Sequence, residues 1–124
     1  MANPRATVKP STKLSPAEIA GRLKSLPGWR LENNAIVRDY QTDGWPTTLM
    51  LVNAIGFFAE AADHHPDLAV SWGKVQVKLW THSAGGVTAS DMELAQVIEQ
   101  TALWRPPAGG GSALRGTTKK FVGS

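Results

Sequence analysis

The sequence predicts an α+β domain in which a four-stranded, mainly antiparallel sheet carries three helices on one face. Helical and extended patterns follow one another along the chain in the order α-β-β-α-β-β-α. Within each pair of extended runs the connection is a short turn, which favours antiparallel pairing. Strands paired in this way bury one face of their sheet against the helices between them, and this defines the fold class.

The first helix opens with a capping box in the stretch "LSPAEIAGRLKSLPGW". The Ser15 hydroxyl can accept a hydrogen bond from the backbone N–H of Glu18, while the Glu18 carboxylate reaches back to the backbone of Ser15. Pro16 suits the first helical position because no backbone donor is needed there. A short helix is therefore expected from about Pro16 to Ser25.

The next two predicted strands flank the pair Asn33-Asn34 in the stretch "GWRLENNAIVRDYQT". Asparagine tolerates the positive φ of a tight hairpin turn, and β-forming residues stand on both sides of the pair. Two antiparallel strands are expected here.

A long helix is predicted in the stretch "DGWPTTLMLVNAIGFFAEAADHH", with Asp43 as its candidate N-cap and Pro46 in its first turn. Small or apolar residues recur there at helical spacing, at Leu49, Val52, Gly56 and Ala59. Pro66 is expected to end the helix, because a proline disfavours helical geometry in the residue before it.

The second strand pair precedes the last helix. In "KVQVKLWTH" an apolar face alternates with a polar face, and the apolar residues are Val75, Val77 and Leu79. This pattern predicts a half-buried strand, with which the shorter "LAVSW" is expected to pair. A turn at Gly85-Gly86 and a capping box of Thr88 and Asp91 come next. They open a helix whose apolar positions are Leu94, Ala95, Ile98 and Ala102.

Charge divides the chain into three parts. The net charge is +3, but seven of the thirteen Lys and Arg residues lie in residues 1–13 and 105–124, which contain no acid. The part between them has six basic and ten acidic residues and is therefore −4. Basic ends with many Gly and Pro residues cannot bury enough apolar surface to fold alone. We expect a domain at residues 14–104 between disordered basic tails at 1–13 and 105–124.

Composition excludes several classes of protein. Without cysteine the chain has no disulfide framework, no thiolate zinc site and no cysteine nucleophile. The longest apolar run is too short and too interrupted to span a bilayer. The basic ends lack the interleaved aromatic residues that favour nucleic-acid binding. A cytoplasmic protein that binds neither membrane nor nucleic acid is expected.

All three histidines fall within one short segment, His64 and His65 in "EAADHHPDL" and His82 in "LWTHSAGG". Glu60 and His64 are four residues apart on the predicted helix, so the carboxylate is expected to orient the imidazole. His65 points further round the helix, or leaves it because of Pro66. His82 ends the strand beside this helix, so three imidazoles and one carboxylate can converge on one cleft.

General acid–base catalysis is the chemistry that this cluster favours, because imidazoles titrate near neutrality and can move protons within one bound substrate. A metal site is disfavoured, since adjacent histidines rarely face one metal and the spacing H-x-x-x-H is absent. A serine hydrolase is disfavoured because the chain has no G-x-S-x-G. For any single histidine a structural role is the simpler interpretation, but not for three histidines with Glu60 in register.

The stretch "EAADHHPDLAVSWGKVQVKLWTHSAGGVTASD" resembles the signature of the pterin-4a-carbinolamine dehydratases. That signature has an acidic residue, three further positions, His-His-Pro, an aromatic residue, and then a His and an Asp. Its counterparts in this chain are Glu60, His64, His65, Pro66, Trp72, His82 and Asp91. The resemblance extends over roughly Leu14 to Ala102 and leaves both tails outside.

The resemblance implies a dehydratase that removes water from 4a-hydroxytetrahydropterin to give quinonoid dihydropterin. An acid must protonate the departing hydroxyl while a base removes the N5 proton, and imidazoles on opposite sides of a flat ring can do both. The pterin is then the substrate, and neither a metal nor a cofactor is implied. The acid–base groups implied are His64, His65 and His82, of which His65 and His82 lie nearest the proton transfers.

Further site residues follow from the same resemblance. Glu60, Asp63 and Asp91 are expected to orient the imidazoles or to hold the pterin, and Trp29 or Trp72 to offer it a stacking face. Two alternatives stay open. Either tryptophan can belong to the core, and Asp91 can act as a capping acid alone.

The resemblance also implies an oligomer and leaves a second function open. Trp80 is expected on the polar side of the sheet, which indicates a covered surface in a homodimer or a tetramer. Dehydratase-like proteins also serve as assembly factors for RuBisCO in carboxysome-bearing bacteria, and basic tails on an acidic core suit such surface contacts. The alternative is therefore a catalytically silent, carboxysome-associated chaperone with RuBisCO as its partner.

Overall fold

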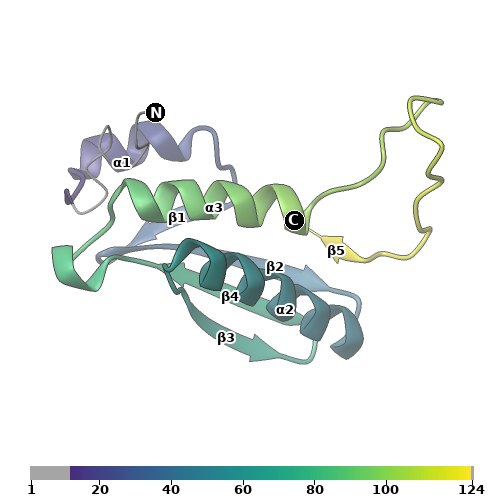
Figure 1. Cartoon of the computed structure of the whole chain (residues 1–124), viewed down its shortest axis with the longest axis horizontal. Helices are drawn as coiled ribbons and strands as arrows, with labels where there is room; N and C mark the ends of the chain where they lie inside the picture. The colour runs from purple at the N-terminus through teal and green to yellow at the C-terminus, as the bar shows by residue number, and fades with distance from the viewer. Residues whose placement is uncertain (1–11, 124) are drawn as a thin grey trace.

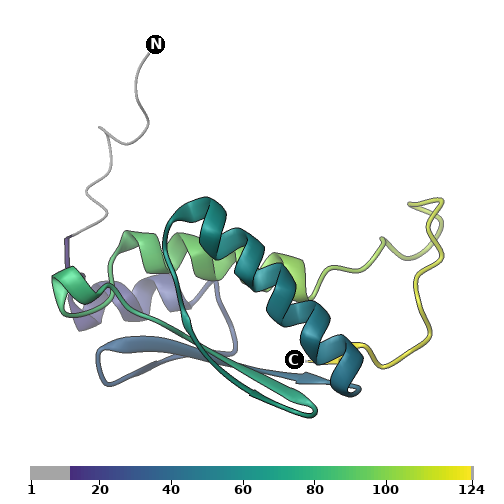
Figure 2. The same cartoon turned by 60° about the horizontal axis from the view of Figure 1, so that its bottom comes forward.

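An antiparallel sheet with three helices on one face forms the body of the protein (Figure 1). The computed structural model describes residues 12–123. Its elements are α1 (Pro16–Leu23), β1 (Trp29–Glu32), β2 (Ala35–Thr42), α2 (Trp45–Ala62), β3 (Asp67–Ser71), β4 (Lys74–Leu79), the 3₁₀ turn η2 (His82–Ala84), α3 (Ala89–Ala102) and β5 (Val122–Gly123). The predicted order is confirmed, and η2 and β5 are additional. A second view shows the helices together on one side of the sheet (Figure 2).

The strands follow the order β1-β2-β4-β3 and pair antiparallel throughout. Both predicted hairpins form, and Asn33 has the positive φ, 57°, expected in the first turn. The two hairpins are joined by β2 and β4, which pair over the register Ile36↔Leu79 to Gln41↔Lys74. Two local hairpins thus become one sheet through a single long-range pairing, with α2 as the connection.

One face of this sheet is buried under the helices. In β4 the alternating residues Val75, Val77 and Leu79 are completely buried, as their pattern predicts. They share a hydrophobic core with side chains from α2 and α3, including Ile55 and Ile98. The apolar positions predicted for the last helix, at 94, 95, 98 and 102, are all buried as well. Because only one face of β4 is apolar, a slip of one residue would expose the core, and this sets its register.

A largely buried carboxylate, Glu99, fixes α3 on the sheet. It accepts hydrogen bonds from the Trp29 indole (2.9 Å), the Arg38 guanidinium (3.0 Å) and the Tyr40 hydroxyl (2.6 Å). Burial raises the pKa of Glu99, but these donors outweigh burial and the net shift of the pKa is downward. Burial and the Glu99 carboxylate both raise the pKa of Tyr40. Gly28 leaves room for the guanidinium, whose carbon would lie 2.8 Å from a Cβ at that position.

The starts of the first two helices differ in how well the sequence predicts them. The capping box of α1 is confirmed, with Ser15 and Glu18 joined by hydrogen bonds of 3.0 and 3.1 Å. The predicted N-cap of α2, Asp43, is wrong. Gly44 is the N-cap, and no side chain caps the helix. Its φ of 144° favours glycine, and a Cβ there would lie 3.1 Å from the Trp72 ring.

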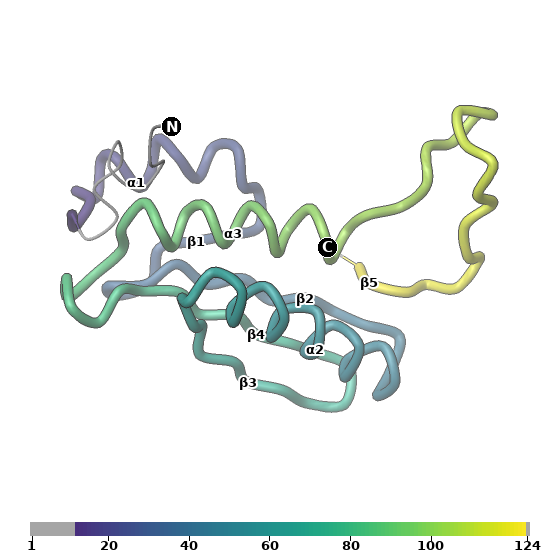
Figure 3. The backbone as a smooth tube through the Cα atoms, viewed as in Figure 1, coloured from purple at the N-terminus to yellow at the C-terminus, as the bar shows by residue number. Residues whose placement is uncertain are grey.

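The C-terminal segment returns to the sheet, which differs from the solvated tail expected for residues 105–124. After α3 the chain makes a wide loop and comes back as β5 beside β2 (Figure 3). Thr42 pairs with Val122, and Arg105 donates a hydrogen bond to the Val122 carbonyl (3.0 Å). Composition predicted a tail because it takes no account of the free edge that β2 offers beyond the shorter β1.

Of the basic N-terminal tail expected at residues 1–13, residues 1–11 lie outside the described part of the chain. Among residues 12–123, no helix combines the length and the apolar character needed to cross a membrane.

Candidate active site

The two adjacent histidines lie just past the end of α2. The helix ends at Ala62, and Asp63 takes a left-handed conformation with φ 51° and ψ 44°. The Asp63 backbone N–H donates back to the carbonyls of Ala59 and Glu60, which closes the helix. The helix therefore ends before Pro66, earlier than predicted, and neither histidine is helical.

His64 is held by a buried carboxylate. Its Nε2 lies 2.6 Å from Oδ1 of Asp91, which is completely buried at the start of α3. The second Asp91 oxygen accepts hydrogen bonds from the Thr81 hydroxyl and the Thr88 backbone N–H, each at 2.8 Å. A carboxylate has no proton to give, so Nε2 carries the hydrogen of this contact, and in the neutral form of the ring Nδ1 keeps its lone pair. The arrangement presents Nδ1 as a proton acceptor.

Asp91 combines two roles that the sequence left as alternatives. One oxygen closes the predicted capping box with Thr88, and the other binds His64. The capping role and the orienting role therefore do not compete, because they use different oxygens of one carboxylate.

Glu60 pairs with His65, not with His64 as predicted. Its Oε1 lies 2.9 Å from Nε2 of His65. Both side chains are exposed, so solvent screens this contact. The prediction failed because the left-handed turn at Asp63 removes His64 from the helical face that carries Glu60.

His82 begins η2, three residues after the last residue of β4. The loop is closed by the Thr81 N–H, which donates to the Gly86 carbonyl (2.9 Å), and Gly85 has φ 70°, as suits the predicted Gly-Gly turn. The His82 side chain is exposed. Its ring stacks on the Trp80 indole, with 3.9 Å between centroids and 24° between planes.

Two hydrogen-bonded links bring the histidine segments together. Asp91 binds both His64 and Thr81, the residue before the third histidine. Trp80 donates from Nε1 to Oδ2 of Asp67, which directly follows the His-His-Pro sequence (3.2 Å). The three histidines therefore share one end of the sheet, as the sequence predicts.

Three other predicted site residues take no part in these two hydrogen-bonded links. Trp29 is 5% exposed and bound to Glu99, which is eight residues, about 12 Å, along α3 from Asp91. Trp72 is 69% exposed in the turn between β3 and β4, at the end of that hairpin away from the histidines. Asp63 is exposed and contributes its backbone to the end of α2. Trp29 thus fits the core alternative, whereas Trp72 belongs to neither the core nor the histidine cluster.

Sequence reasoning missed the contributions of Thr81, Trp80 and Asp67 to the site. Each of them is next to, or two residues from, a predicted histidine, so closeness in the chain was the available signal. Trp80 was instead assigned to an oligomer surface. Their contacts depend on the direction of each side chain around the hairpin end, which a sequence pattern does not specify.

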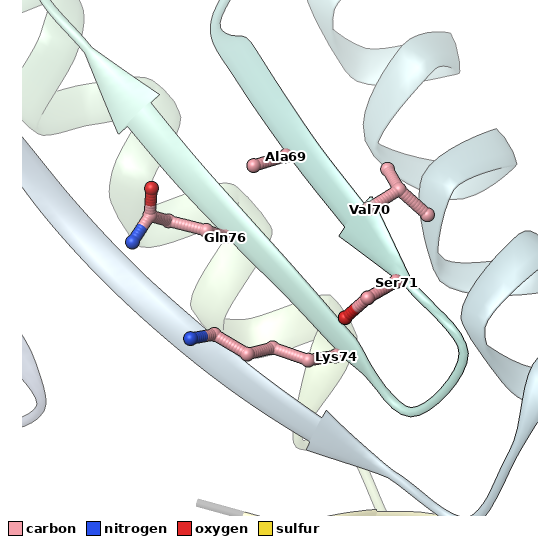
Figure 4. A pocket seen from close by; sticks show the side chains of 5 residues that line it. All are labelled: Ala69, Val70, Ser71, Lys74 and Gln76. Atoms are coloured by element: carbon pink, nitrogen blue, oxygen red, sulfur yellow. The ribbon is translucent and has the colours of Figure 1, made fainter.

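Two surface hollows lie away from the histidines. One hollow of about 180 Å³ lies over β3 and β4, where Ser71, Lys74 and Gln76 point to the uncovered side of the sheet (Figure 4). Another of about 310 Å³ is lined by the C-terminal loop. Neither is lined by a histidine. Within residues 12–123, no group of three or more His, Cys, Asp or Glu residues is placed to hold a metal ion.

Known proteins are similar to this chain over most of its length. A family model described as pterin 4 alpha carbinolamine dehydratase matches residues 12–101. The chain is 48% identical over 88 residues to a candidate pterin-4-alpha-carbinolamine dehydratase of Aquifex aeolicus (strain VF5), covering 71% of this chain and 89% of that protein. It is 43% identical over 90 residues to one of Roseiflexus sp. (strain RS-1), covering 73% and 97%.

A solved structure is similar as well. The crystal structure of a transcriptional coactivator/pterin dehydratase from Brucella melitensis superposes with a TM-score of 0.68 at 30% identity, covering 70% of this chain and 95% of that one. The family match ends at residue 101, so the C-terminal loop and β5 lie beyond it.

Proposed function

This chain belongs to the pterin-4a-carbinolamine dehydratase family, and we propose that its three histidines dehydrate the pterin by general acid–base catalysis. The activity is that of a hydro-lyase. The bond between C4a and the hydroxyl oxygen breaks, and the oxygen leaves as water with a proton from an imidazolium. The N5 proton passes to a neutral imidazole, and the N5–C4a bond becomes double.

The link between His64 and Asp91 is the observation that carries this proposal. At 2.6 Å it is a short, charge-assisted hydrogen bond. It holds the imidazole in one orientation and one tautomer, with Nδ1 free. General acid–base catalysis needs side chains positioned within hydrogen-bond reach of the protons that move. The capping contacts of Asp91 use its other oxygen, so Oδ1 is left for His64.

His65 and His82 are proposed to carry the two proton transfers. Both side chains are exposed and can reach a bound substrate. His65 uses Nε2 on Glu60 and keeps Nδ1 for the pterin. The two histidines come from segments on either side of the β3–β4 hairpin, so a flat ring between them could exchange protons with both.

Stopped-flow dehydration of chemically generated carbinolamine tests the proposal. Each of the substitutions His64→Ala, His65→Ala and His82→Ala is expected to lower the rate about a hundredfold, the scale of one general acid or base. The matched control is Asp63→Ala, which removes an exposed side chain beside the cluster and is expected to keep the rate. A wild-type rate no faster than buffer would contradict the proposal.

We also propose that the protein is a cytoplasmic homodimer. The absence of cysteine suits a reducing compartment. β3 is an edge strand of the sheet with Val70 exposed, and such an edge can pair with a second copy. Val70→Lys is then expected to give a monomer in sedimentation velocity, and the matched exposed change Val97→Lys on α3 to leave the dimer. A tetramer in the wild type, or an unchanged mass for Val70→Lys, would overturn this assignment.

One observation favours a second candidate function, contact with an acidic protein partner such as RuBisCO. The loop between α3 and β5 carries Arg105, Arg115, Lys119 and Lys120 and no acid. Leu114 is largely exposed within it. A basic surface with an exposed apolar side chain suits an acidic partner. The protein would have this role in addition to the dehydratase activity or, as a chaperone, in place of it.

Charge reversal tests this second function without removing β5. Arg115→Glu with Lys119→Glu is expected to abolish salt-sensitive binding of RuBisCO in biolayer interferometry. Arg22→Glu with Lys24→Glu changes the net charge equally on another surface and is expected to keep binding. If both double variants bind like the wild type, the loop is not a docking surface.

A further inference from the structure

The Trp80 indole is held at two points next to the proposed active site. Its ring stacks on His82 at 3.9 Å between centroids, nearly parallel, and its Nε1 donates to Oδ2 of Asp67 at 3.2 Å. It follows the last residue of β4, on the side of the sheet away from the core. Trp80 is only partly exposed, so these two contacts account for much of the surface that the sequence assigned to an interface.

The three histidines are held in different ways. His64 and His65 each have a carboxylate within hydrogen-bonding distance of Nε2. For His82, no hydrogen bond from either ring nitrogen to another described residue is found. Its orientation within the exposed turn η2 therefore depends on the indole face against which it lies. Both nitrogens remain available to a substrate.

Asp67 connects this stack to the other histidines. It follows His65 by two residues and pairs with Lys78 in the register of β3 and β4. Its carboxylate accepts the hydrogen bond of Trp80, which lies two residues beyond Lys78 on the neighbouring chain segment. The indole is thus anchored to the segment that carries two histidines while its face supports the third.

We propose that Trp80 is a positioning residue for the dehydration, holding the His82 imidazole toward the pterin while Asp67 holds the indole. The catalytic part of this inference rests on the proposed function of the site. It assigns no proton transfer to Trp80. The indole restricts the rotation of an exposed ring that must meet a flat substrate at a defined angle, and its loss lowers the fraction of molecules with a competent His82.

Four variants separate this role from a merely structural one. Trp80→Ser removes the stack, Trp80→Phe keeps an aromatic face without the N–H, and Asp67→Ala removes the anchor. Trp72→Ser is the matched control, because it removes a second tryptophan, at the opposite end of the same hairpin. Dispersion of the amide NMR spectrum verifies that each variant is folded.

Two measurements are made on each variant. The first is the NMR shift of the His82 ring protons, which lie in the ring current of the indole, and the second is kcat and KM for dehydration. Trp80→Ser is expected to move the His82 signals downfield and to lower kcat about fivefold to tenfold with little change in KM. Trp80→Phe is expected to restore most of kcat, and Asp67→Ala to lie between. Trp72→Ser is expected to change neither measurement.

The outcomes distinguish this proposal from the proposed function. If the wild type dehydrates the pterin but Trp80→Ser leaves the His82 signals or kcat at the wild-type value, Trp80 does not position His82. If Trp80→Phe is as slow as Trp80→Ser, an aromatic face is not what the site requires. If the wild type does not dehydrate the pterin while its His82 signals still respond to Trp80→Ser, the proposed function fails and the stack remains as structure alone.

Discussion

Asp91 shows how one side chain can serve the fold and the site together. Its Thr88 contact starts α3, and its contact with His64 fixes the orientation of that imidazole. The sequence predicted the first contact from spacing alone. The second joins residues 27 positions apart and depends on how α3 lies against the end of α2.

We predict that Asp91→Asn reverses the tautomer of His64. The amide oxygen of the new side chain is expected to accept the hydrogen bond from the Thr88 N–H. Its NH₂ group then faces the imidazole, so Nε2 of His64 must become an acceptor. Nδ1 then carries the hydrogen, and the rate is expected to fall about a hundredfold. The unfolding free energy is expected to fall by about 1–2 kcal/mol, the scale of a charge-assisted hydrogen bond.

Imidazole ¹⁵N shifts of His64 report this tautomer directly. Asp63→Asn is the matched control, because it makes the same change at an exposed aspartate one residue from His64. An unchanged His64 tautomer in Asp91→Asn would mean that Asp91 does not set the orientation of the ring.

Glu99 is predicted to give the protein an acid-sensitive component of stability. Its pKa is lowered in the folded state, so its contribution is present above its ordinary pKa, near 4.5, and is lost as pH falls through the folded value. Glu99→Gln leaves Arg38 without its carboxylate and is expected to cost about 3 kcal/mol at neutral pH. The variant is also expected to lose less stability than the wild type on acidification.

Urea unfolding between pH 7 and pH 3 measures both effects. The exposed Glu93→Gln, on the same helix, is the control and is expected to follow the wild-type curve. A Glu99→Gln curve parallel to that of the wild type would show that Glu99 is not the acid-sensitive group.

At the scale of elements, the two ends of α2 differ from the sequence prediction. A glycine stands at the N-cap where a polar side chain was predicted, and a left-handed residue ends the helix before the predicted proline. Gly44 begins the helix with a positive φ, and Asp63 ends it in the left-handed region. The periodicity of the helix predicted its existence, and Pro46 its first turn. The caps could not be predicted because they depend on the path of the chain entering and leaving the helix, which the sheet and the Trp72 ring determine.

Two glycines of this helix are predicted to respond in opposite ways to alanine. Gly44→Ala meets a positive φ and the Trp72 ring, and it is expected to cost about 2 kcal/mol of unfolding free energy. Gly56→Ala lies in the helix interior with open space around its Cβ and is expected to add about 1 kcal/mol. Thermal unfolding of the two variants measures the difference, and a change of the same sign in both would contradict the capping geometry.

At the scale of the whole molecule, the C-terminal segment completes the sheet. β1 pairs with β2 only as far as Arg38, which leaves the second half of β2 without a partner on that side. β5 pairs with Gln41 and Thr42 there, and the Asp43 N–H donates to the Phe121 carbonyl (3.0 Å). The basic loop is therefore fastened at both ends.

Ending the chain after Lys120 is predicted to open this edge. The Asp43 amide loses its acceptor and is expected to exchange with deuterium at least tenfold faster. The melting temperature is expected to fall by about 4 °C, as for a loss of 1 kcal/mol. Hydrogen exchange and calorimetry measure the two effects. Leu114→Ala, within the loop, is the control and is expected to change neither. Unchanged exchange at Asp43 would show that β5 does not cover the edge.

The sequence by itself determined the order of elements, both hairpins and the buried face of β4, because these depend on local periodicity, capping and composition. It also predicted the histidines as the chemical centre. Tertiary structure alone decided which carboxylate holds which imidazole, the stack of Trp80 on His82, the burial of Trp29 against Glu99 and the return of β5. The physical reason is that these contacts join distant segments and depend on side-chain direction at helix and strand ends. At such an end, one residue in a left-handed conformation, such as Asp63, changes the direction of the chain and of the side chains after it.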